Sequence, residues 1–399
     1  MAAERLRILM VADGRSPIAL NWIAGLVDAG LEVHLQSTFP ARPELPLASC
    51  EVLPVAFGAV SGSASRGEAG SGLRRVIPVG VRTALRQWIV PRSLPKAAGS
   101  LQAAIQMLQP DLIHAMRIPF EGMLSALAVE GLVSAPPLLV SIWGNDFTLH
   151  APATRRMAEL TRLTLKHAAA LHADCQRDLR LANEWGFREG QPAVVLPGGG
   201  GVQPEIFFPE KASVQSFNEP LTVIQPRGFR AYVQNEAFFR AIPLILHGSP
   251  GTRFIFPGMA NEAQAQEWVR QFNLSQSVVL LPFQTRQEMA ELFRRAAVIV
   301  SPTTHDGTPN TLLEALACGC FPVAGDLESL REWITPGVNG LLCDPTNPQA
   351  LADTVVQALA SPELRGQAQP INLKLIAERA SFPVVMEKAQ VFYRQLVKK

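Results

Sequence analysis

Short apolar runs alternate along the whole chain with longer segments in which apolar residues recur every three or four positions. The runs are typical of buried β-strands and the longer segments of amphipathic helices. The strand-like runs lie near residues 7–11, 32–37, 112–115, 138–143, 169–173 and 193–196, and near residues 221–225, 253–256, 277–281, 297–301 and 320–323. Because strand–helix alternation produces parallel sheets covered on both faces, we predict an α/β protein with doubly wound domains.

A stretch rich in glycine and proline, from Pro197 to Pro209, separates the two alternations. We therefore expect a first domain over residues 1–205 and a second over residues 206–378. The glycines of this stretch either let the backbone approach a ligand or act as a hinge. Residues 379–399 end in an amphipathic helical pattern and are expected to return to the first domain.

Composition narrows the classes of function. The formal net charge is only +2, so no nucleic-acid partner is expected. The five cysteines show neither a CxxC pair nor zinc-ligand spacing, and we expect no metal. The first apolar run is short and a glycine–proline turn follows it, so it predicts a strand and not a signal peptide. No apolar stretch reaches membrane-spanning length, and a cytoplasmic protein is expected.

The most informative segment is Asp306-Gly-Thr-Pro-Asn-Thr-Leu-Leu-Glu314, which follows the strand-like run 297–301. Asp306 is expected in a loop at the carboxyl end of that strand, and Glu314 about one turn into the next helix. Ligands of open α/β sheets bind outside these strand ends. The helix start offers free N–H groups that suit a phosphate, and the flanking carboxylates suit sugar and ribose hydroxyls. This combination indicates a sugar nucleotide.

The stretch from Val298 to Leu342 resembles the retaining glycosyltransferases of family four, whose motif has two acids separated by seven residues. The family usually has Glu where this chain has Asp306. The resemblance implies the GT-B fold, two Rossmann-like domains facing each other across a cleft. It implies a nucleotide-diphosphate sugar donor of the UDP or GDP type and no other cofactor. It also implies that Asp306 binds the sugar and Glu314 the ribose. The donor contacts expected in the intervening loop are Thr308, Pro309, Asn310 and Thr311.

Arg227 and Arg230 lie just after the first strand of the second domain. Arginine forks match the geometry of a diphosphate. In the family this place carries an Arg and, five residues later, a Lys. Arg227 fits the first position, whereas Tyr232 occupies the second, so Arg230 is expected to supply the second cation. Two ordinary surface arginines would give the same pattern. Gly258 matches the family's glycine near the nucleobase.

The first domain is expected to hold the acceptor. Ser16 follows the first strand and either contacts the ligand or only caps the next helix. His114, at the end of another strand, either faces the acceptor or is a structural histidine. Asn145 and Asp146 either face the acceptor or close an Asx turn. Just before them, Trp143 replaces a histidine that the family often has near the transferred sugar.

Residues 66–96 combine basic and apolar side chains with one acid, Glu68. The basic residues are Arg66, Arg74, Arg75, Arg82, Arg86, Arg92 and Lys96. A basic amphipathic segment is typical of a membrane-surface contact, here the inner membrane face. A loop leading into a helix that packs on the domain would look similar, and Pro78 and Gly80 favour that alternative.

Taken together, these features predict a retaining glycosyltransferase that moves a sugar to a hydroxyl of a glycan, glycolipid or lipid-linked saccharide. Asp306, Arg227 and Arg230 are the expected catalytic residues, since they would stabilise the charge that develops on the leaving diphosphate. The alternatives are a nucleotide-sugar epimerase or hydrolase on the same scaffold, or a non-catalytic nucleotide-sugar-binding subunit. The departures at Trp143 and Tyr232 favour the last of these.

Overall fold

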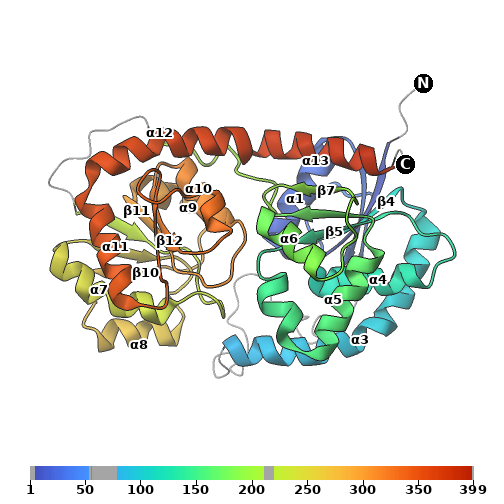
Figure 1. Cartoon of the computed structure of the whole chain (residues 1–399), viewed down its shortest axis with the longest axis horizontal. Helices are drawn as coiled ribbons and strands as arrows, with labels where there is room; N and C mark the ends of the chain where they lie inside the picture. Colours follow the sequence, from blue (N-terminus) through green and yellow to red (C-terminus); the bar gives the residue numbers. More distant parts are fainter. Residues whose placement is uncertain (1–4, 54, 56–78, 211–219, 398–399) are drawn as a thin grey trace. The chain divides into compact units, whose positions relative to one another are not determined.

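The computed structural model describes residues 5–53, 55, 79–210 and 220–397 of the 399-residue chain (Figure 1). The chain forms two compact units. The first comprises Met1–Gly201 together with Val385–Lys399, and the second comprises Val202–Val384. The division therefore falls within the glycine-rich stretch that follows Pro197.

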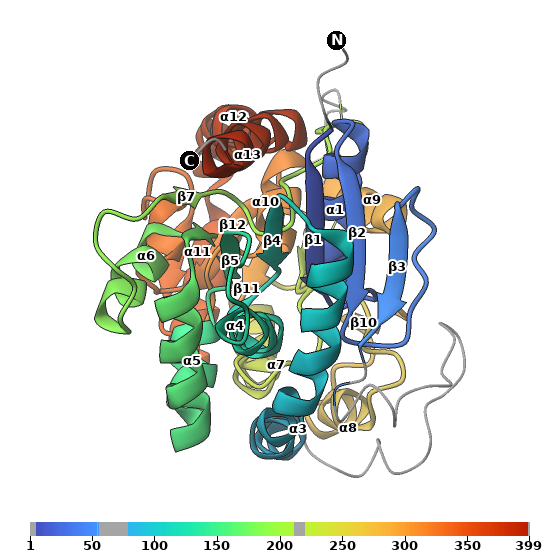
Figure 2. The ribbon, with the colours of Figure 1, turned by 90° about the vertical axis from the view of Figure 1, so that its right-hand side faces the viewer.

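The first unit is built on a seven-stranded parallel sheet with the order β3-β2-β1-β4-β5-β6-β7. Figure 2 shows β1, β2 and β3 side by side. Its elements are β1 (Arg7–Ala12), α1 (Pro17–Asp28), β2 (Glu32–Ser37), β3 (Ser49–Val52), α3 (Val79–Leu108), β4 (Leu112–Ala115), α4 (Met123–Glu130), β5 (Leu138–Ile142), α5 (Arg155–His167), β6 (Ala170–Ala173), α6 (Gln176–Glu184) and β7 (Ala193–Val195). Short helical turns occupy Ile118–Gly122, Asp146–His150 and Ala151–Ala153.

The second unit has a six-stranded parallel sheet with the order β10-β9-β8-β11-β12-β13. Its elements are β8 (Thr222–Ile224), α7 (Asn235–Gly248), β9 (Arg253–Phe256), α8 (Ala263–Gln271), β10 (Val278–Leu280), α9 (Arg286–Arg295), β11 (Val298–Ser301), α10 (Asn310–Ala317), β12 (Phe321–Gly325), a 3-10 turn at Leu330–Glu332, β13 (Leu341–Cys343), α11 (Pro348–Ala360) and α12 (Pro362–Arg379). The last helix, α13 (Phe382–Val397), begins here, and its residues from Val385 onward belong to the first unit.

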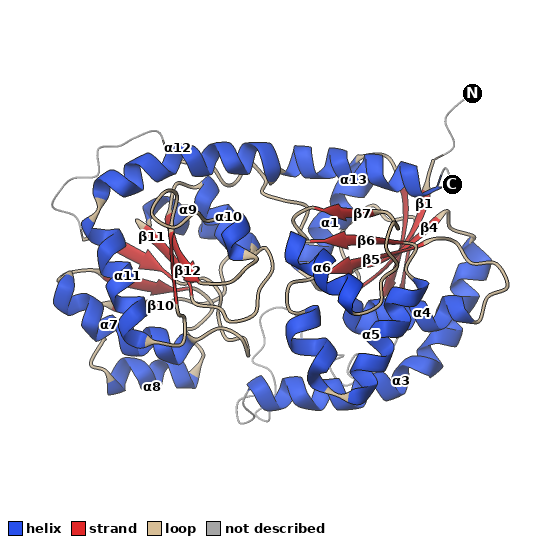
Figure 3. Ribbon diagram, in the orientation of Figure 1, coloured by secondary structure: helices blue, strands red, loops and turns tan. Residues whose placement is uncertain are grey.

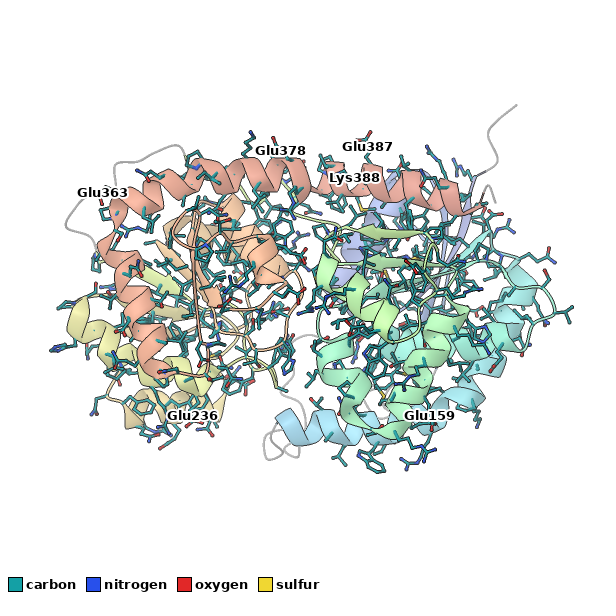
Figure 4. All side chains as sticks on the ribbon, viewed as in Figure 1. Glu159, Glu236, Glu363, Glu378, Glu387 and Lys388 are labelled. Carbon is teal, nitrogen blue, oxygen red and sulfur yellow. The ribbon has the colours of Figure 1, made fainter. Side chains whose placement is uncertain are left out.

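Helices cover both faces of each sheet (Figure 3). In the second unit, α7, α8 and α11 supply one apolar core, and α9, α10 and the end of α12 supply the other. In the first unit, α3, α4 and α5 pack on one face. The exposed faces of α5 and α7 carry charged pairs: Glu159 on α5 and Glu236 on α7 (Figure 4) each pair with an arginine one turn away.

The prediction of two doubly wound, Rossmann-like domains is confirmed, because both sheets are parallel and both strand orders reverse beside the first strand. Two edge strands, β3 and β13, were not predicted. Pro78 and Gly80, which disfavour a helix, were expected to cut any long helix in the basic segment, but Gly80 does not do so. Helix α3 begins at Val79, directly after Pro78, and runs for 30 residues through Pro91 and Pro95.

Candidate functional site

The topology of the second unit brings Arg227 and Asp306 together. Strands β8 and β11 are parallel neighbours, and the strand order reverses between them. Arg227 follows β8 and Asp306 follows β11, so both lie beyond carboxyl ends at the switch point where such sheets bind ligands. Their side chains form an ion pair of 2.6 Å, and each is 13% exposed. Burial lowers the pKa of Arg227, but the charge of Asp306, together with Tyr232 and the hydrogen bonds to both residues, outweighs burial and raises the pKa overall.

The loop that carries Arg227 is held by a buried amide pair. The side-chain carbonyl of Gln225 accepts a hydrogen bond from the Arg227 N–H at 2.8 Å. The amide nitrogen of Gln225 donates to Asn235 at 2.5 Å, and Asn235 in turn donates to the carbonyl of Gly228 at 3.0 Å. Gly228 has φ +59°, a value that favours glycine. These contacts fix the direction in which Arg227 leaves the strand.

In the sequence, Tyr232 occupies the position of the family's lysine, and Arg230 was expected to supply the second cation. The Tyr232 hydroxyl lies 3.5 Å from the guanidinium of Arg227. Arg230 is exposed, and its guanidinium donates to the carbonyl of Phe229 at 3.0 Å. The structure thus places Tyr232, and not Arg230, beside the arginine of the switch point.

Helix α10 begins beside this pair with no side-chain cap among the described residues. Pro309 is its N-cap, and Asn310 and Thr311 are its first helical residues. The Thr311 hydroxyl oxygen is buried and has no hydrogen-bond partner in the described part of the chain. The Thr308 hydroxyl, in contrast, accepts a hydrogen bond from the Trp333 indole at 2.9 Å. An uncapped helix start with an unused hydroxyl can bind an anion.

Glu314 lies farther along α10, beside a residue that the sequence reasoning missed. Arg286, the first residue of α9, approaches it at 3.6 Å. Burial raises the pKa of Glu314 to about 7, and Arg286 opposes that rise. The capping box Thr285-x-x-Glu288 directly after β10 is the sequence signal that could have placed Arg286 at this edge of the sheet.

Gly258 follows β9 and has φ +76°, and its N–H donates to the carbonyl of Pro282 at 3.0 Å. The residue is exposed at the same edge of the sheet as Arg227. A side chain at this position would strain the backbone.

In the first unit, Ser16 caps α1. Its hydroxyl oxygen accepts a long hydrogen bond of 3.4 Å from the N–H of Ala19, and the residue remains half-buried. Asp13 and Arg15 pair beside it at 3.1 Å. Ser16 therefore caps the helix, and its partial exposure is compatible with a ligand contact as well.

The expectation that His114 faces the acceptor was wrong. The residue is 0% exposed. One ring nitrogen bonds to the Tyr393 hydroxyl and the other to Ser141 at 2.8 Å. Burial, with a smaller effect of His172, lowers the pKa of His114 well below its usual value. His114 is therefore a structural histidine.

Asp146 is also enclosed. Its side chain is 0% exposed and pairs with Arg117 at 2.6 Å. It accepts further hydrogen bonds from the backbone N–H groups of Ile118 and Trp143. The expectation that Asp146 faces the acceptor was therefore wrong, because its carboxylate closes the turn. Asn145 is half-buried and accepts a hydrogen bond from Arg117 at 3.1 Å.

One cluster in the described residues has metal-ligand character. The ligand atoms of Asp174, Cys175 and Asp178 lie within 4.8 Å of one another and are buried. Arg177 donates to an oxygen of Asp178 at 2.7 Å, so a cation already balances part of the charge. We assign no metal to it.

Helix α3 contains the described part of the basic segment. Arg66, Arg74 and Arg75 lie outside the described residues, as does the side chain of Arg82. Leu85, Trp88 and Ile89 are 45%, 57% and 42% exposed. No helix in the described ranges is both long and apolar enough to span a bilayer.

Comparison with known families assigns both units. The profile described as Glycosyl transferases group 1 matches residues 209–371, and that of the Glycosyl transferase 4-like domain matches residues 13–199. A D-inositol 3-phosphate glycosyltransferase of Corynebacterium urealyticum is 24% identical over 90% of this chain and 89% of its own. Another, from Nocardiopsis dassonvillei, is 27% identical, and the match spans only 50% of that relative's length.

Two further proteins are similar. The GDP-mannose:cellobiosyl-diphosphopolyprenol alpha-mannosyltransferase of Xanthomonas campestris is 25% identical over 67% of each chain. The structure of HepE from Anabaena in complex with UDP-glucose has a TM-score of 0.72 and 14% identity, and it covers 98% of this chain and 100% of its own. This likeness confirms the GT-B fold. The second unit therefore carries a group 1 glycosyltransferase domain and the first unit a glycosyltransferase 4-like domain, and the protein is a glycosyltransferase.

Proposed function

We propose that the protein transfers a sugar, with retention of the anomeric configuration, from a nucleotide-diphosphate sugar to a hydroxyl acceptor. The observation that carries the proposal is the Arg227–Asp306 pair at the switch point of the second sheet, next to the uncapped start of α10. A cation and free N–H groups suit a diphosphate, and a carboxylate beside them suits sugar hydroxyls. The names of the relatives include a GDP-sugar donor, and the HepE complex holds a UDP-sugar.

In this mechanism Arg227 and the N–H groups of Asn310 and Thr311 hold the diphosphate. As the bond between the sugar carbon and the phosphate oxygen breaks, negative charge grows on that oxygen, and these donors stabilise it. Asp306 exchanges part of its contact with Arg227 for sugar hydroxyls, and Glu314 accepts from the ribose. An oxygen of the departing diphosphate receives the acceptor's proton, on the face where the new bond forms.

Other donor contacts follow from the same placement. Arg230 is exposed near the loop and can turn toward the diphosphate. Gly258 leaves open backbone at the end of β9, where the base would lie. Pro309 and Thr308 shape the loop around the phosphates. From the first unit, Ser16 is the contact proposed at its own switch point, and Asn145 is the remaining polar group proposed for the acceptor.

We also propose a lipid-linked saccharide as the acceptor and a peripheral location at the cytoplasmic membrane face. The apolar side chains of Leu85, Trp88 and Ile89 are exposed on one face of α3. Arg92 and Lys96 continue that face, and the helix contains no acid from Val79 to Leu108. Such a helix suits an anionic membrane, where each cation contributes about 1 kcal/mol.

The side chain of Arg86, unlike those of Arg92 and Lys96, lies near two aromatic rings of the first unit. Its guanidinium lies 5.4 Å from the ring centroid of Phe39 and 5.1 Å from that of Phe120. Arg86 therefore packs on the domain, and we assign the cationic part of the membrane contact to Arg92 and Lys96.

Incubation with UDP-, GDP- and ADP-sugars and a panel of saccharide and lipid-linked acceptors tests the transfer. Thermal shift identifies the donor, and NMR of the product gives its anomeric configuration. An inverted product would overturn retention. Donor consumption without any glycosylated product would instead indicate the hydrolase or epimerase.

Co-sedimentation with liposomes tests the membrane contact. Binding should rise with the fraction of anionic lipid and fall with salt. The triple variant Leu85→Ser, Trp88→Ser, Ile89→Ser should lose it. Met107→Ser is the control, because Met107 is 80% exposed on the same helix and lies away from these cations in sequence. Equal loss in both variants, or no binding by the unaltered protein at low salt, would contradict the proposal.

A further inference from the structure

Arg286 and Glu314 are held together by two helices that begin at the same edge of the second sheet. Arg286 opens α9 after β10, and Glu314 lies in α10 after β11. The two side chains approach to 3.6 Å, and the Glu314 side chain is 16% exposed and that of Arg286 36%. The buried ring of Phe207 lies 5.4 Å from the guanidinium carbon of Arg286. Arg286 thus lies close to both a buried aromatic ring and the Glu314 carboxylate.

Among the described residues, Arg286 is the charged group that acts on Glu314. Burial raises the pKa of Glu314 to about 7, and the charge and hydrogen bond of Arg286 limit that rise. The other arginine of this α9 face, Arg294, acts on Cys318. Helix α12 also packs on α10. The residue of α12 near Gly319, just after the end of α10, is Gln369, whose side chain is neutral. In the described part of the chain, no other cation contributes to the pKa of Glu314.

The ionisation state of Glu314 matters for the ribose contact. A carboxylate has two acceptor oxygens and can accept hydrogen bonds from both hydroxyls of a ribose. A protonated carboxyl must use one oxygen as a donor, and a neutral acceptor forms weaker hydrogen bonds than an ionised one. Near neutral pH, a modest change in the surroundings of Glu314 therefore changes how well the site can bind a ribose.

We propose that Arg286 is a positioning residue that keeps Glu314 ionised and turned toward the donor ribose, and thereby sets the pH range in which the donor binds. This inference rests on the proposed function, because it requires that Glu314 binds the ribose of a nucleotide sugar. It predicts that loss of Arg286 weakens binding through Glu314 and not through the diphosphate.

Calorimetry from about pH 5.5 to about pH 8.5 with UDP-glucose and GDP-mannose tests the proposal. Their diphosphate is doubly esterified, so its charge stays constant over this range. For the unaltered protein, affinity should fall as the pH drops through about 7. Arg286→Gln should lower affinity about tenfold at neutral pH and move the midpoint upward, and Arg286→Lys should restore most of both.

Three controls separate this effect from general damage. Arg294→Gln removes an arginine from the same helix that also lies over an aromatic ring, Phe208 at 4.9 Å, but it should leave the pH profile unchanged. Glu314→Gln should abolish the pH dependence, and in that background Arg286→Gln should have no further effect on affinity. A 2′,3′-dideoxy analogue of the donor that binds more tightly should bind the unaltered protein and the Arg286→Gln variant equally, because it lacks the ribose hydroxyls that would contact Glu314.

The possible results separate a failure of the proposed function from a failure of the role proposed for Arg286. If no UDP-, GDP- or ADP-sugar binds the unaltered protein, the proposed function fails. If one binds but Arg286→Gln leaves the midpoint unchanged, this inference is overturned while the proposed function stands. If Arg286→Gln weakens the dideoxy analogue as strongly as the full donor, the arginine acts on the diphosphate and the ribose role is wrong.

Discussion

Each unit contains an arginine–aspartate pair of 2.6 Å beyond the carboxyl ends of its parallel sheet. In the first unit Arg117 pairs with Asp146, whose side chain is 0% exposed and accepts two backbone N–H groups besides. In the second unit Arg227 pairs with Asp306, and both side chains keep 13% of their surface exposed. The pairs look alike in sequence, yet the first closes a turn and the second remains accessible to a ligand.

The surroundings of the two pairs explain the difference. Beside Asp306 the described residues leave buried hydroxyl oxygens of Ser301, Thr303 and Thr311 without hydrogen-bond partners, and α10 starts without a side-chain cap. Buried polar groups are normally satisfied, so such a concentration of unused groups indicates a place where a ligand supplies the partners. At Asp146 the backbone N–H groups of Ile118 and Trp143 already supply partners for the carboxylate, although the Trp143 indole nitrogen is buried without a partner among the described residues. The two pairs therefore differ in the exposure of their carboxylates, and the second pair also lies beside the uncapped start of α10.

Asp146→Ala should cause the largest effect on stability, about 3–5 kcal/mol, because it leaves the Arg117 charge without its closest partner and frees two backbone N–H groups. Asp306→Ala should cost less, since the Asp306 side chain is 13% exposed whereas that of Asp146 is 0% exposed. Urea unfolding of the two variants measures the difference. Equal losses of stability would contradict the distinction between the two pairs.

For activity, in contrast to stability, we expect the larger effect at the second pair, from Arg227→Ala. Loss of a charge stabiliser next to the leaving diphosphate should lower kcat by on the order of 10²–10³, with little change in the unfolding midpoint. Arg230→Ala should have a much smaller effect, since Arg230 is exposed and bonds to Phe229. If the two variants lose activity equally, the assignment of Arg227 as the residue at the switch point is wrong.

The same contrast shows what the sequence could predict. The strand runs were readable because central strands of parallel sheets are continuously apolar, and the switch points followed from their order. The edge strands β3 and β13 were missed because β3 is half-exposed and the apolar run of β13 is confined to three residues between Gly340 and Asp344. His114 and Asp146 were assigned to the acceptor because polarity at a strand end was visible. Their partners, Tyr393 and Arg117, lie 279 and 29 residues away, and only the fold shows them.

Glu314→Gln should weaken nucleotide-sugar binding by about 1–3 kcal/mol while it stabilises the unliganded protein at alkaline pH. Burial raises the pKa of Glu314 to about 7, so ionised Glu314 costs stability, and that cost grows as the pH rises from the unfolded pKa, near 4.5, through about 7. The variant lacks this cost. Its melting temperature should exceed that of the unaltered protein at pH 8 but not at pH 4, below both pKa values. A lower melting temperature at pH 8 would contradict the desolvation argument.

Tyr393→Phe should have the smallest effect, about 1 kcal/mol of stability, and no effect on donor affinity. The Tyr393 hydroxyl accepts a hydrogen bond from the Trp22 indole at 3.0 Å and bonds to His114, so it joins α13 to α1 and β4 inside the first unit. Removing it leaves the buried Trp22 N–H unpaired. Phe392→Leu is a matched control on the same helix, because it alters apolar packing without touching this network. If Tyr393→Phe changed donor affinity by calorimetry, the enclosed polar groups of the first unit would not be purely structural, and the contrast with the second unit would have to be redrawn.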